Sequence, residues 1–270
     1  MSPQLKVTVL GCGASSGVPR IGNDWGACDP NEPRNRRTRS SLLIERRMDS
    51  ADWPTRVLVD SGPDLRAQLL SAGVGFVDGV VYTHAHADHV HGIDDLRAFW
   101  QNTKRLVDIH ADDATFKHLE AAFGYCFHRP AGSFYPPILR RHGIAVGVPL
   151  TIEGGGGPLT LTPFLQLHGD TTSLGLRVGR FAYSCDMSGL PEESLPYLGD
   201  LDVWIVGVLR YRPHPSHLSV AEVTEWVKRL KPARALLTHM HTDLDYATLK
   251  RELPPPIEPA YDGMVIDLEA

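Results

Sequence analysis

The sequence contains few cysteines, and they follow no pattern. The chain of 270 residues has four, and none of them belongs to a Cys-x-x-Cys pair: Cys12, Cys28, Cys126 and Cys185. A disulfide scaffold or a cysteine-based metal module needs more of them at regular spacing. This scarcity argues against a fold held together by disulfides. It fits the reducing cytosol, and we therefore expect a cytoplasmic protein.

Long apolar runs and an excess of positive charge are lacking as well. No stretch approaches the roughly 20 apolar residues that a membrane-spanning helix needs. The first residues also lack the basic and then apolar pattern of a secretory signal. We therefore expect no membrane partner. The net charge of −5 gives no general attraction to nucleic acid, so a nucleic acid is not the favoured partner.

The remaining composition is that of an ordinary globular domain, with 42% hydrophobic and 22% charged residues. No internal repeat or linker divides the chain, so we expect one domain over residues 1–270. The run Gly154–Gly157 is better explained by a hairpin loop than by a domain boundary. The stretch Tyr125–His142 is rich in Pro, Gly, Arg and aromatic residues. It is either a lid near a site or a plain surface loop, and we favour the loop.

Strand and helix patterns are mixed along the whole chain, which predicts an α/β fold. The predicted strands are Leu5–Leu10, Ser41–Ile44, Arg56–Val59, Gly79–Thr83, Val107–His110, Leu159–Leu167, Leu174–Ser184, Asp202–Leu209, Ala233–Thr238 and Met264–Leu268. Helices are expected up to Ala72, around Ile93–Trp100, and over Asp112–Phe123, Ser219–Leu230 and Asp243–Arg251. The fourth of these helices should begin with a capping box, because Ser219 and Glu222 have the Ser-x-x-Glu spacing.

The most informative stretch is His84-Ala85-His86-Ala87-Asp88-His89, directly after the apolar run Val80-Val81-Tyr82. Two histidines at positions i and i+2 of an extended segment point the same way, because side chains alternate along a strand. Asp88 and His89 follow where the chain must turn, so they can face a second point in space. This arrangement suits two adjacent metal ions better than one, and it is a stronger pattern than a chance group of surface histidines.

Three further residues that can bind metal follow apolar strands elsewhere. His168 comes after the strand Leu159–Leu167, Asp186 after Phe181–Cys185, and His239 after Ala235–Thr238. Any one of them alone would be interpreted as a surface or turn residue. Their shared position suggests loops gathered at one edge of a sheet, where functional sites commonly form.

This ordered set of histidines and aspartates resembles the metallo-β-lactamase superfamily of metal-dependent hydrolases. The resemblance covers nearly the whole chain, from Gly11-Cys12-Gly13 to the last strand. Thr83–Arg97, Tyr183–Gly189 and Leu237–His241 are most similar to the phosphodiesterase branch, which contains phosphoribosyl cyclic phosphate phosphodiesterase and, more distantly, ribonuclease Z. The resemblance implies a four-layer αββα sandwich with the site at the sheet edges.

By position, the resemblance implies two divalent metal ions, zinc or manganese, and assigns their ligands. The first ion would be held by His84, His86 and His168, and the second by Asp88, His89 and His239, while Asp186 would bridge the two. A carboxylate with two oxygens can join cations about 3.5–4 Å apart. Asp88 is also assigned to the catalytic residues.

Two more residues are given roles beside the metals. Asp60 matches the aspartate of the first superfamily motif and would orient a ligand histidine, although it could instead cap a helix. His217 precedes the predicted helix at Ser219 and would protonate the leaving group, although it could be an exposed loop histidine. His214 competes for that role but matches the motif less well.

The loop Gly17–Arg39 departs from the cyclic phosphodiesterases that the chain resembles, which carry several cysteines there for a structural zinc. Only Cys28 remains, so this extra zinc site is doubtful even if His241 joins it. Arg34–Arg39 contains four arginines, which form either a solvated surface or a phosphate clamp that includes Arg37 and Arg39. Ser15 and Ser16 could also touch phosphate, although a plain turn is favoured there.

We therefore expect a dinuclear metal-dependent hydrolase that cleaves a small or cyclic phosphodiester with metal-activated hydroxide. The alternatives are a ribonuclease Z-like activity on RNA, hydrolysis of a thioester or lactone on the same fold, and a metal-binding accessory protein without activity. The expected partner is a small anionic phosphodiester substrate, and a homodimer is left open.

Overall fold

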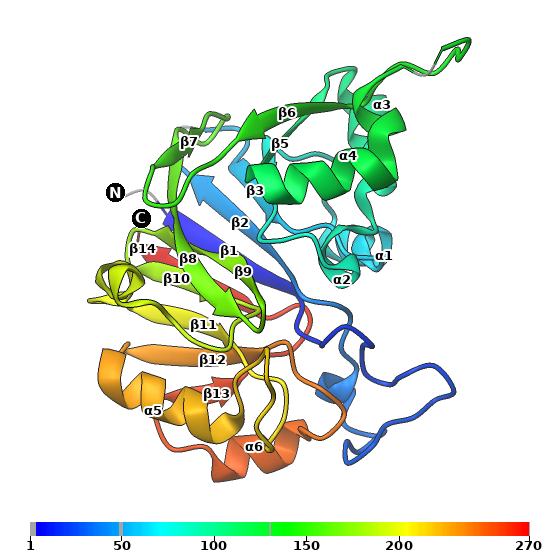
Figure 1. Ribbon diagram of the computed structural model, residues 1–270. Coiled ribbons are helices and arrows are strands. Elements are labelled where there is room, and N and C mark those ends of the chain that lie inside the picture. Colours follow the sequence, from blue (N-terminus) through cyan, green and yellow to red (C-terminus); the bar gives the residue numbers. More distant parts are fainter. Residues whose placement is uncertain (1–3, 49–50, 130, 270) are drawn as a thin grey trace.

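A computed structural model describes residues 4–48, 51–129 and 131–269 of the chain. Two seven-stranded sheets lie face to face, with helices on both outer sides (Figure 1). In spatial order, the first sheet consists of β14 (Val265–Glu269), β1 (Gln4–Gly11), β2 (Ser41–Arg47), β3 (Thr55–Val59), β4 (Gly79–Val81), β5 (Val107–Ala111) and β6 (Leu139–Gly143). The second consists of β13 (Ile257–Pro259), β12 (Arg234–Thr238), β11 (Val203–Gly207), β10 (Phe181–Ser184), β9 (Thr171–Val178), β8 (Leu159–His168) and β7 (Leu150–Ile152).

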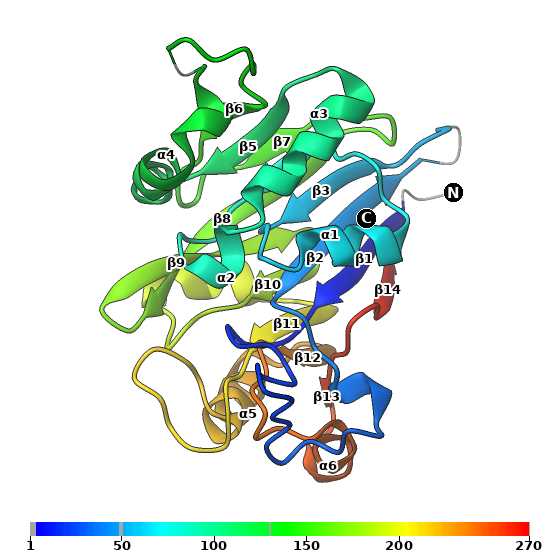
Figure 2. The same ribbon diagram turned by 90° about the vertical axis from the view of Figure 1, so that its right-hand side faces the viewer.

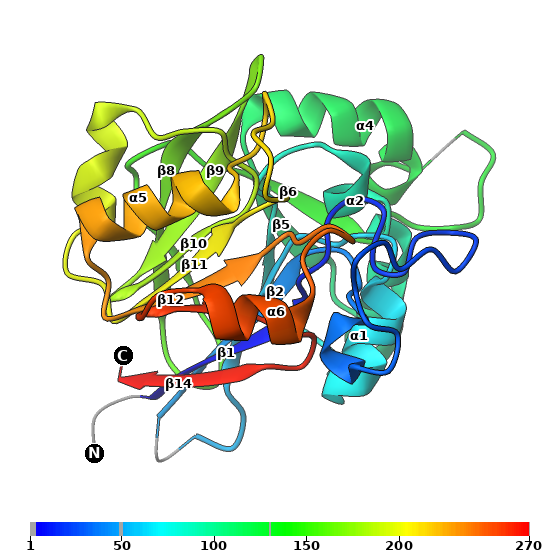
Figure 3. The same cartoon turned by 90° about the horizontal axis from the view of Figure 1, so that it is seen from below.

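Helices cover the outer face of each sheet. The first sheet is covered by α1 (Leu65–Ala72), α2 (Ala87–Val90), α3 (Arg97–Thr103) and α4 (Asp113–Phe127), and α1 to α3 lie in front of it in Figure 2. The second is covered by α5 (Val220–Leu230) and α6 (Tyr246–Glu252), which face the viewer in Figure 3. Short 3₁₀ segments are η1 (Pro33–Asn35), η2 (Ile93–Leu96) and η3 (Glu192–Leu198). The predicted four-layer αββα sandwich is confirmed.

The four layers result from alternating side chains on central strands that are apolar on both faces. On β2, Leu42 and Ile44 belong to the core between the sheets, whereas Leu43 between them belongs to the core under α1 to α4. On β3, Val57 and Val59 likewise face the second sheet while Leu58 faces the helices. A strand whose two faces are both buried has a nearly continuous run of apolar residues in its sequence.

Both sheets are mixed, and each changes from antiparallel to parallel pairing at one place. In the first sheet β1, β2 and β3 pair antiparallel, and β3 to β6 pair parallel. In the second sheet β7 to β10 pair antiparallel, and β10 to β13 pair parallel. The carboxyl ends of the parallel strands in each sheet therefore lie at one edge, where sites commonly form.

Most predicted elements are present, with a few differences. The predicted strand Leu174–Ser184 is wrong, because the chain turns at Gly179, whose φ of +54° favours glycine, and makes two strands, β9 and β10. The helix expected around Ile93–Trp100 is two short segments, the 3₁₀ segment η2 followed by α3. Strands β6, β7 and β13 were not predicted.

The positions of the neighbouring helices and strands also test two loop predictions. Gly154–Gly157 lies in the hairpin between the antiparallel strands β7 and β8, as expected. The stretch Tyr125–His142 is only partly a loop, because α4 continues to Phe127 and β6 begins at Leu139. Residues 131–138 between them contain no helix or strand, and residue 130 lies outside the described part. None of the helices that the structure describes is long and apolar enough to cross a membrane.

Candidate metal centre

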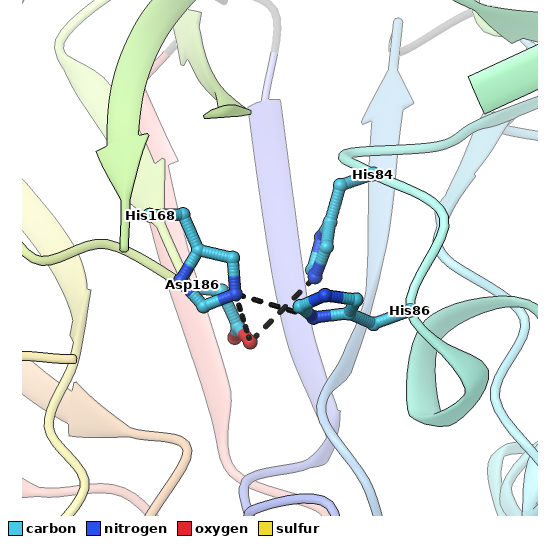
Figure 4. Close-up of side chains that lie close together, drawn as sticks. All are labelled: His84, His86, His168 and Asp186. Carbon is cyan, nitrogen blue, oxygen red and sulfur yellow. Dashed lines mark hydrogen bonds and ion pairs between the residues drawn. The ribbon is translucent and has the colours of Figure 1, made fainter. Parts of the chain in front are cut away.

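Four side chains from three different loops meet between the sheets. His84 and His86 follow β4, His168 ends β8, and Asp186 follows β10 (Figure 4). The ring nitrogens His168 Nε2 and His86 Nδ1 are 3.2 Å apart. Asp186 Oδ2 lies 3.7 Å from both His84 Nε2 and His168 Nε2. One donor atom from each of the four residues lies within 4.8 Å of the others, which is close enough to hold one metal ion.

A second group of donors shares Asp186 with the first. It consists of His89, Cys185, Asp186 and His239, again with one donor atom each within 4.8 Å of the others. Asp186 Oδ1 is 3.4 Å from His89 Nε2 and 3.0 Å from His239 Nδ1. Asp88 Oδ2 lies 3.5 Å from His89 Nε2, at the border of this group. The structure thus brings together all seven residues for which metal binding was predicted, with one carboxylate between two groups.

The donor atoms are buried and lack hydrogen-bond partners. This is true of His84 Nε2, His89 Nε2, Asp88 Oδ2 and Asp186 Oδ1 in the part of the chain that the structure describes. Buried polar atoms are almost always paired, so adjacent exceptions need an explanation. Positive ions in the two donor groups would together satisfy all four atoms, and imidazole with carboxylate is a donor set that zinc and manganese accept. The residues therefore fit divalent metal.

In three of these histidines, the ring nitrogen that points away from the donor group lies within hydrogen-bond distance of another residue. His89 Nδ1 is 2.7 Å from Asp60 Oδ2, His84 Nδ1 is 3.0 Å from Thr83 Oγ1, and His168 Nδ1 is 2.7 Å from the carbonyl oxygen of Ser216. Such contacts fix the tautomer and aim the other nitrogen at the metal. In all three rings, the nitrogen left over is Nε2.

Asp60, which orients the His89 ring, is fully buried and directly follows β3. Besides the contact with His89, it accepts hydrogen bonds from the backbone N–H and the hydroxyl of Thr83, each at 2.8 Å. The alternative role as a helix cap is wrong, because α1 begins at Leu65 and its N-cap position is Asp64. Asp60 and His239 both have φ in the left-handed region, at +62° and +58°.

The electrostatics of the buried groups favour the state that binds metal. Burial, helped by the neighbouring His89, lowers the pKa of His84 well below its usual value, so this imidazole is neutral. Burial alone would raise the pKa of Asp186, but His239 and His89 hold that pKa well below its usual range. Metal ligation needs neutral imidazole and ionised carboxylate, which are the states of His84 and Asp186. Burial lowers the pKa of His89, but Asp186 and Asp60 outweigh burial and raise this pKa well above its usual value, so this ring would give up a proton when a cation binds.

His217 stands at the mouth of the site, between the metal-facing rings and solvent. Its ring lies 4.9 Å from that of His239, nearly parallel to it, and 4.8 Å from that of His168. His217 Nδ1 is 4.0 Å from Asp186 Oδ2, and the side chain is 14% exposed. Burial, followed by the nearby His239, lowers the pKa of His217 to about 3. His214 lies beside it, with ring centroids 5.3 Å apart.

The two arginines predicted to contact phosphate instead contact other residues of the chain. Arg37 is neither a solvated residue nor a phosphate clamp, because its side chain is 2% exposed and donates to Asn35 Oδ1 at 3.2 Å and towards Cys28 Sγ at 3.9 Å. Arg39 is only partly exposed and pairs with Asp64 at 3.2 Å. Arg37 cannot act as a surface residue because it is buried. The run of arginines in the sequence gives no sign of which of them is buried.

The two serines remain candidates by position only. Ser15 is exposed, and the hydroxyl of Ser16 donates to the carbonyl of Gly17 at 3.3 Å. Their segment passes beside the end of β12, because Gly13 pairs with Met240, the residue after His239. This places the segment near the metal centre without showing a contact to it.

Among the described residues, no separate set of metal donors gathers around Cys28. Its thiol donates to the carbonyl of Thr242 at 3.4 Å, while His241 Nδ1 lies 3.3 Å from Asp243. Over the residues that the structure describes, the two groups around Asp186 are the only sets of three or more donors close enough to share a metal ion. Cys28 and His241 thus contact different partners and do not come together as ligands of a structural zinc.

Sequence reasoning missed two contributors to the second donor group. Cys185 was taken as the last residue of a strand, and its position beside Asp186 was the available signal. Ser40, whose hydroxyl lies 3.3 Å from His239 Nδ1, follows the arginine run and carried no signal of its own.

Comparison with known proteins identifies the family of the chain. A Beta-lactamase superfamily domain matches residues 55–240. A crystal structure described as a new diphosphatase from the PhnP family is similar over 98% of this chain and 97% of that one, with 32% identity and a TM-score of 0.87.

Curated relatives are similar over shorter parts of their length. An octanoyltransferase of Porphyromonas gingivalis is 31% identical over 266 residues, 96% of this chain but 51% of that protein. A ribonuclease Z of Bradyrhizobium diazoefficiens is 39% identical over 151 residues, 53% of this chain and 44% of that enzyme. The chain thus spans about half the length of these curated relatives. The domain match and the full-length structural similarity place the chain in the metallo-β-lactamase superfamily of hydrolases, in the phosphodiesterase branch that includes the PhnP family.

Proposed function

We propose that the protein is a dinuclear metal-dependent hydrolase that cleaves small phosphodiesters. The observation that carries this proposal is the position of Asp186, whose two oxygens face two separate donor groups. A site for a single ion would need only one of these groups. Two donor groups with a shared carboxylate match a pair of cations about 3.5–4 Å apart.

The ligand assignment follows the donor groups. His84, His86 and His168 would hold one ion, Asp88, His89 and His239 the other, and Asp186 both. When bound, divalent cations lower the pKa of a water near them and neutralise charge that builds up on phosphate oxygens. Asp60 holds the His89 ring in place for this purpose through the 2.7 Å hydrogen bond to Nδ1.

His217 is proposed to assist the leaving group from the open side of the site. With its pKa lowered to about 3, the ring is neutral near pH 7 before substrate binds. A phosphate anion bound beside the ring favours the charged imidazolium, because an opposite charge raises the pKa of a histidine. The protonated ring can then donate its proton to the departing oxygen.

A small substrate is favoured over RNA. The net charge of −5 gives no general attraction to a polyanion, and the ribonuclease Z match covers only 53% of the chain. The diphosphatase name of the similar crystal structure concerns another small phosphorus substrate with a bridging oxygen. We therefore include diphosphate diesters with cyclic and linear phosphodiesters in the proposed substrate class.

Two other activities compete with this proposal. Hydrolysis of a thioester or lactone uses the same fold and the same type of metal site, and fold does not decide between substrates. The octanoyltransferase name belongs to a protein about twice as long as the matched part, so it does not locate that activity in this domain. A metal-binding accessory protein would have no need for His217 at the mouth of the site.

The test is a panel of substrates offered to metal-reconstituted protein. The panel contains a cyclic phosphodiester, a linear alkyl phosphodiester, a diphosphate diester, a precursor tRNA, a thioester and a lactone. His89→Ala serves as the inactive variant and His118→Ala, on the exposed face of α4, as the matched control. Preference for tRNA or for the acyl esters would refute the proposal, and no turnover of any member would favour the accessory protein.

A further inference from the structure

We propose that Cys185 is a thiolate ligand of the second cation and makes that position selective for zinc. The inference rests on the proposed dinuclear site and adds a ligand to it. Cys185 follows β10 and lies next to Asp186 in the sequence. Its side chain is 1% exposed, so the sulfur is enclosed with the other donors rather than open to solvent.

The sulfur lies within the donor group itself. Cys185 Sγ is 3.7 Å from His239 Nδ1, and its group with His89, Asp186 and His239 spans no more than 4.8 Å between donor atoms. All four of these residues are buried. His89 Nε2 and Asp186 Oδ1 in the same group have no hydrogen-bond partner among the described residues, so two further buried atoms face the place where the sulfur lies.

The other three cysteines have different surroundings. The thiol of Cys12 donates to Asp262 Oδ1 at 3.4 Å, that of Cys28 to the carbonyl of Thr242 at 3.4 Å, and that of Cys126 to Asp94 Oδ1 at 3.7 Å. Cys185 instead faces a ring nitrogen that is itself a metal donor, which makes it the cysteine in a position to share a cation.

The chemistry of the sulfur sets the selectivity. As the sulfur–metal bond forms, the thiol proton leaves to solvent and the ligand is thiolate. Thiolate is a soft ligand that favours zinc, whereas manganese prefers carboxylate and water oxygens. The first donor group has only imidazoles and a carboxylate, so the two positions should differ in their preference for zinc over manganese.

The direct test is X-ray absorption spectroscopy of the zinc-loaded wild-type protein, with zinc content measured in parallel. A zinc–sulfur distance of about 2.3 Å is expected. Cys185→Ser should lose this sulfur signal and bind the second zinc at least about tenfold more weakly, with manganese affinity unchanged. Cys126→Ser, which changes a buried thiol away from the site, should keep both.

The outcomes separate this inference from the proposed function. Two zinc ions per chain with nitrogen and oxygen ligands alone would overturn the role of Cys185 and leave the dinuclear site intact. One zinc per chain with a sulfur ligand that Cys185→Ser removes would support Cys185 and refute the dinuclear proposal. The wild-type spectrum decides the sulfur question even if the serine variant does not fold.

Discussion

The two halves of the molecule share a strand pattern but use it differently. In each, antiparallel strands are followed by parallel ones, so β3 corresponds to β10, β4 to β11 and β5 to β12. The first half concentrates its metal donors in one short stretch, residues 84–89, between the end of β4 and the middle of α2. The second half distributes its donors over the ends of β8, β10 and β12, with His217 in the loop after β11.

Equivalent strand ends therefore carry different roles. Asp60 follows β3 and Asp186 follows β10, yet Asp60 contacts the back of a histidine ring while Asp186 lies between the two donor groups. Asp112 follows β5 and caps α4, whereas His239 follows β12 and belongs to a donor group. The fold offers the same edge positions in both halves, and the side chains at those positions determine which half supplies which contact.

The largest expected effect comes from the shared carboxylate. Asp186→Ala should remove at least one of two metal equivalents and lower kcat/KM for phosphodiesters on the order of 10³-fold or more, because each cation supplies several kcal/mol of charge stabilisation. Elemental analysis and steady-state kinetics measure both. Full metal content in a folded Asp186→Ala variant would show that the two donor groups do not depend on this residue.

His217 tests the loop of the second half that corresponds to the metal loop of the first. His217→Ala should keep both metals and lose about 10²–10⁴-fold on an alkyl or cyclic phosphodiester. It should lose much less on a p-nitrophenyl ester, whose leaving group needs no proton. Equal losses on both substrates would assign His217 to substrate positioning, and lost metal would make it a ligand.

Asp60→Asn is the partner experiment to Asp186→Ala. The amide keeps the size of the side chain but orients the His89 ring less firmly, so metal affinity should fall about 10–100-fold. At saturating metal the stoichiometry should return to that of the wild type, which Asp186→Ala cannot achieve. Titration with zinc under competition from a chelator would show the difference, and an unchanged affinity would remove Asp60 from the metal centre.

The smallest effect concerns the segment that joins the halves. Arg37 donates to Asn35, which in turn donates to Asp245 at 2.7 Å, and the backbone N–H of Thr38 donates to Asp262 at 2.7 Å. Arg37→Met should lower the free energy of unfolding by about 1–3 kcal/mol because buried acceptors lose their donor. KM for phosphodiesters should stay unchanged. Chemical denaturation and kinetics check this, and a raised KM with normal stability would restore the phosphate clamp.

The contrast between the halves also explains what the sequence reveals. The donors after β4 are contiguous, so His84 to His89 are recognisable from spacing alone. His168, Asp186 and His239 are separated by long stretches of chain, and only the strand pattern together with the family resemblance connected them. Cys185 and Arg37 were misjudged because burial, which gives each its role, depends on distant segments packing around it. The turn at Gly179 was missed because β9 and β10 follow each other with only Gly179 and Arg180 between them, so the segment reads as one long strand.

The left-handed backbone at His239 has a consequence for the evolution of stability. A residue with a β-carbon is held there at a cost of about 1–3 kcal/mol, which glycine or asparagine would largely avoid. Selection for thermal stability alone would therefore favour those residues at position 239 and remove a ring from the metal centre. Where histidine persists there, the chain retains a local strain that more stable alternatives lack, and this is the trade-off between stability and activity expected of a functional position.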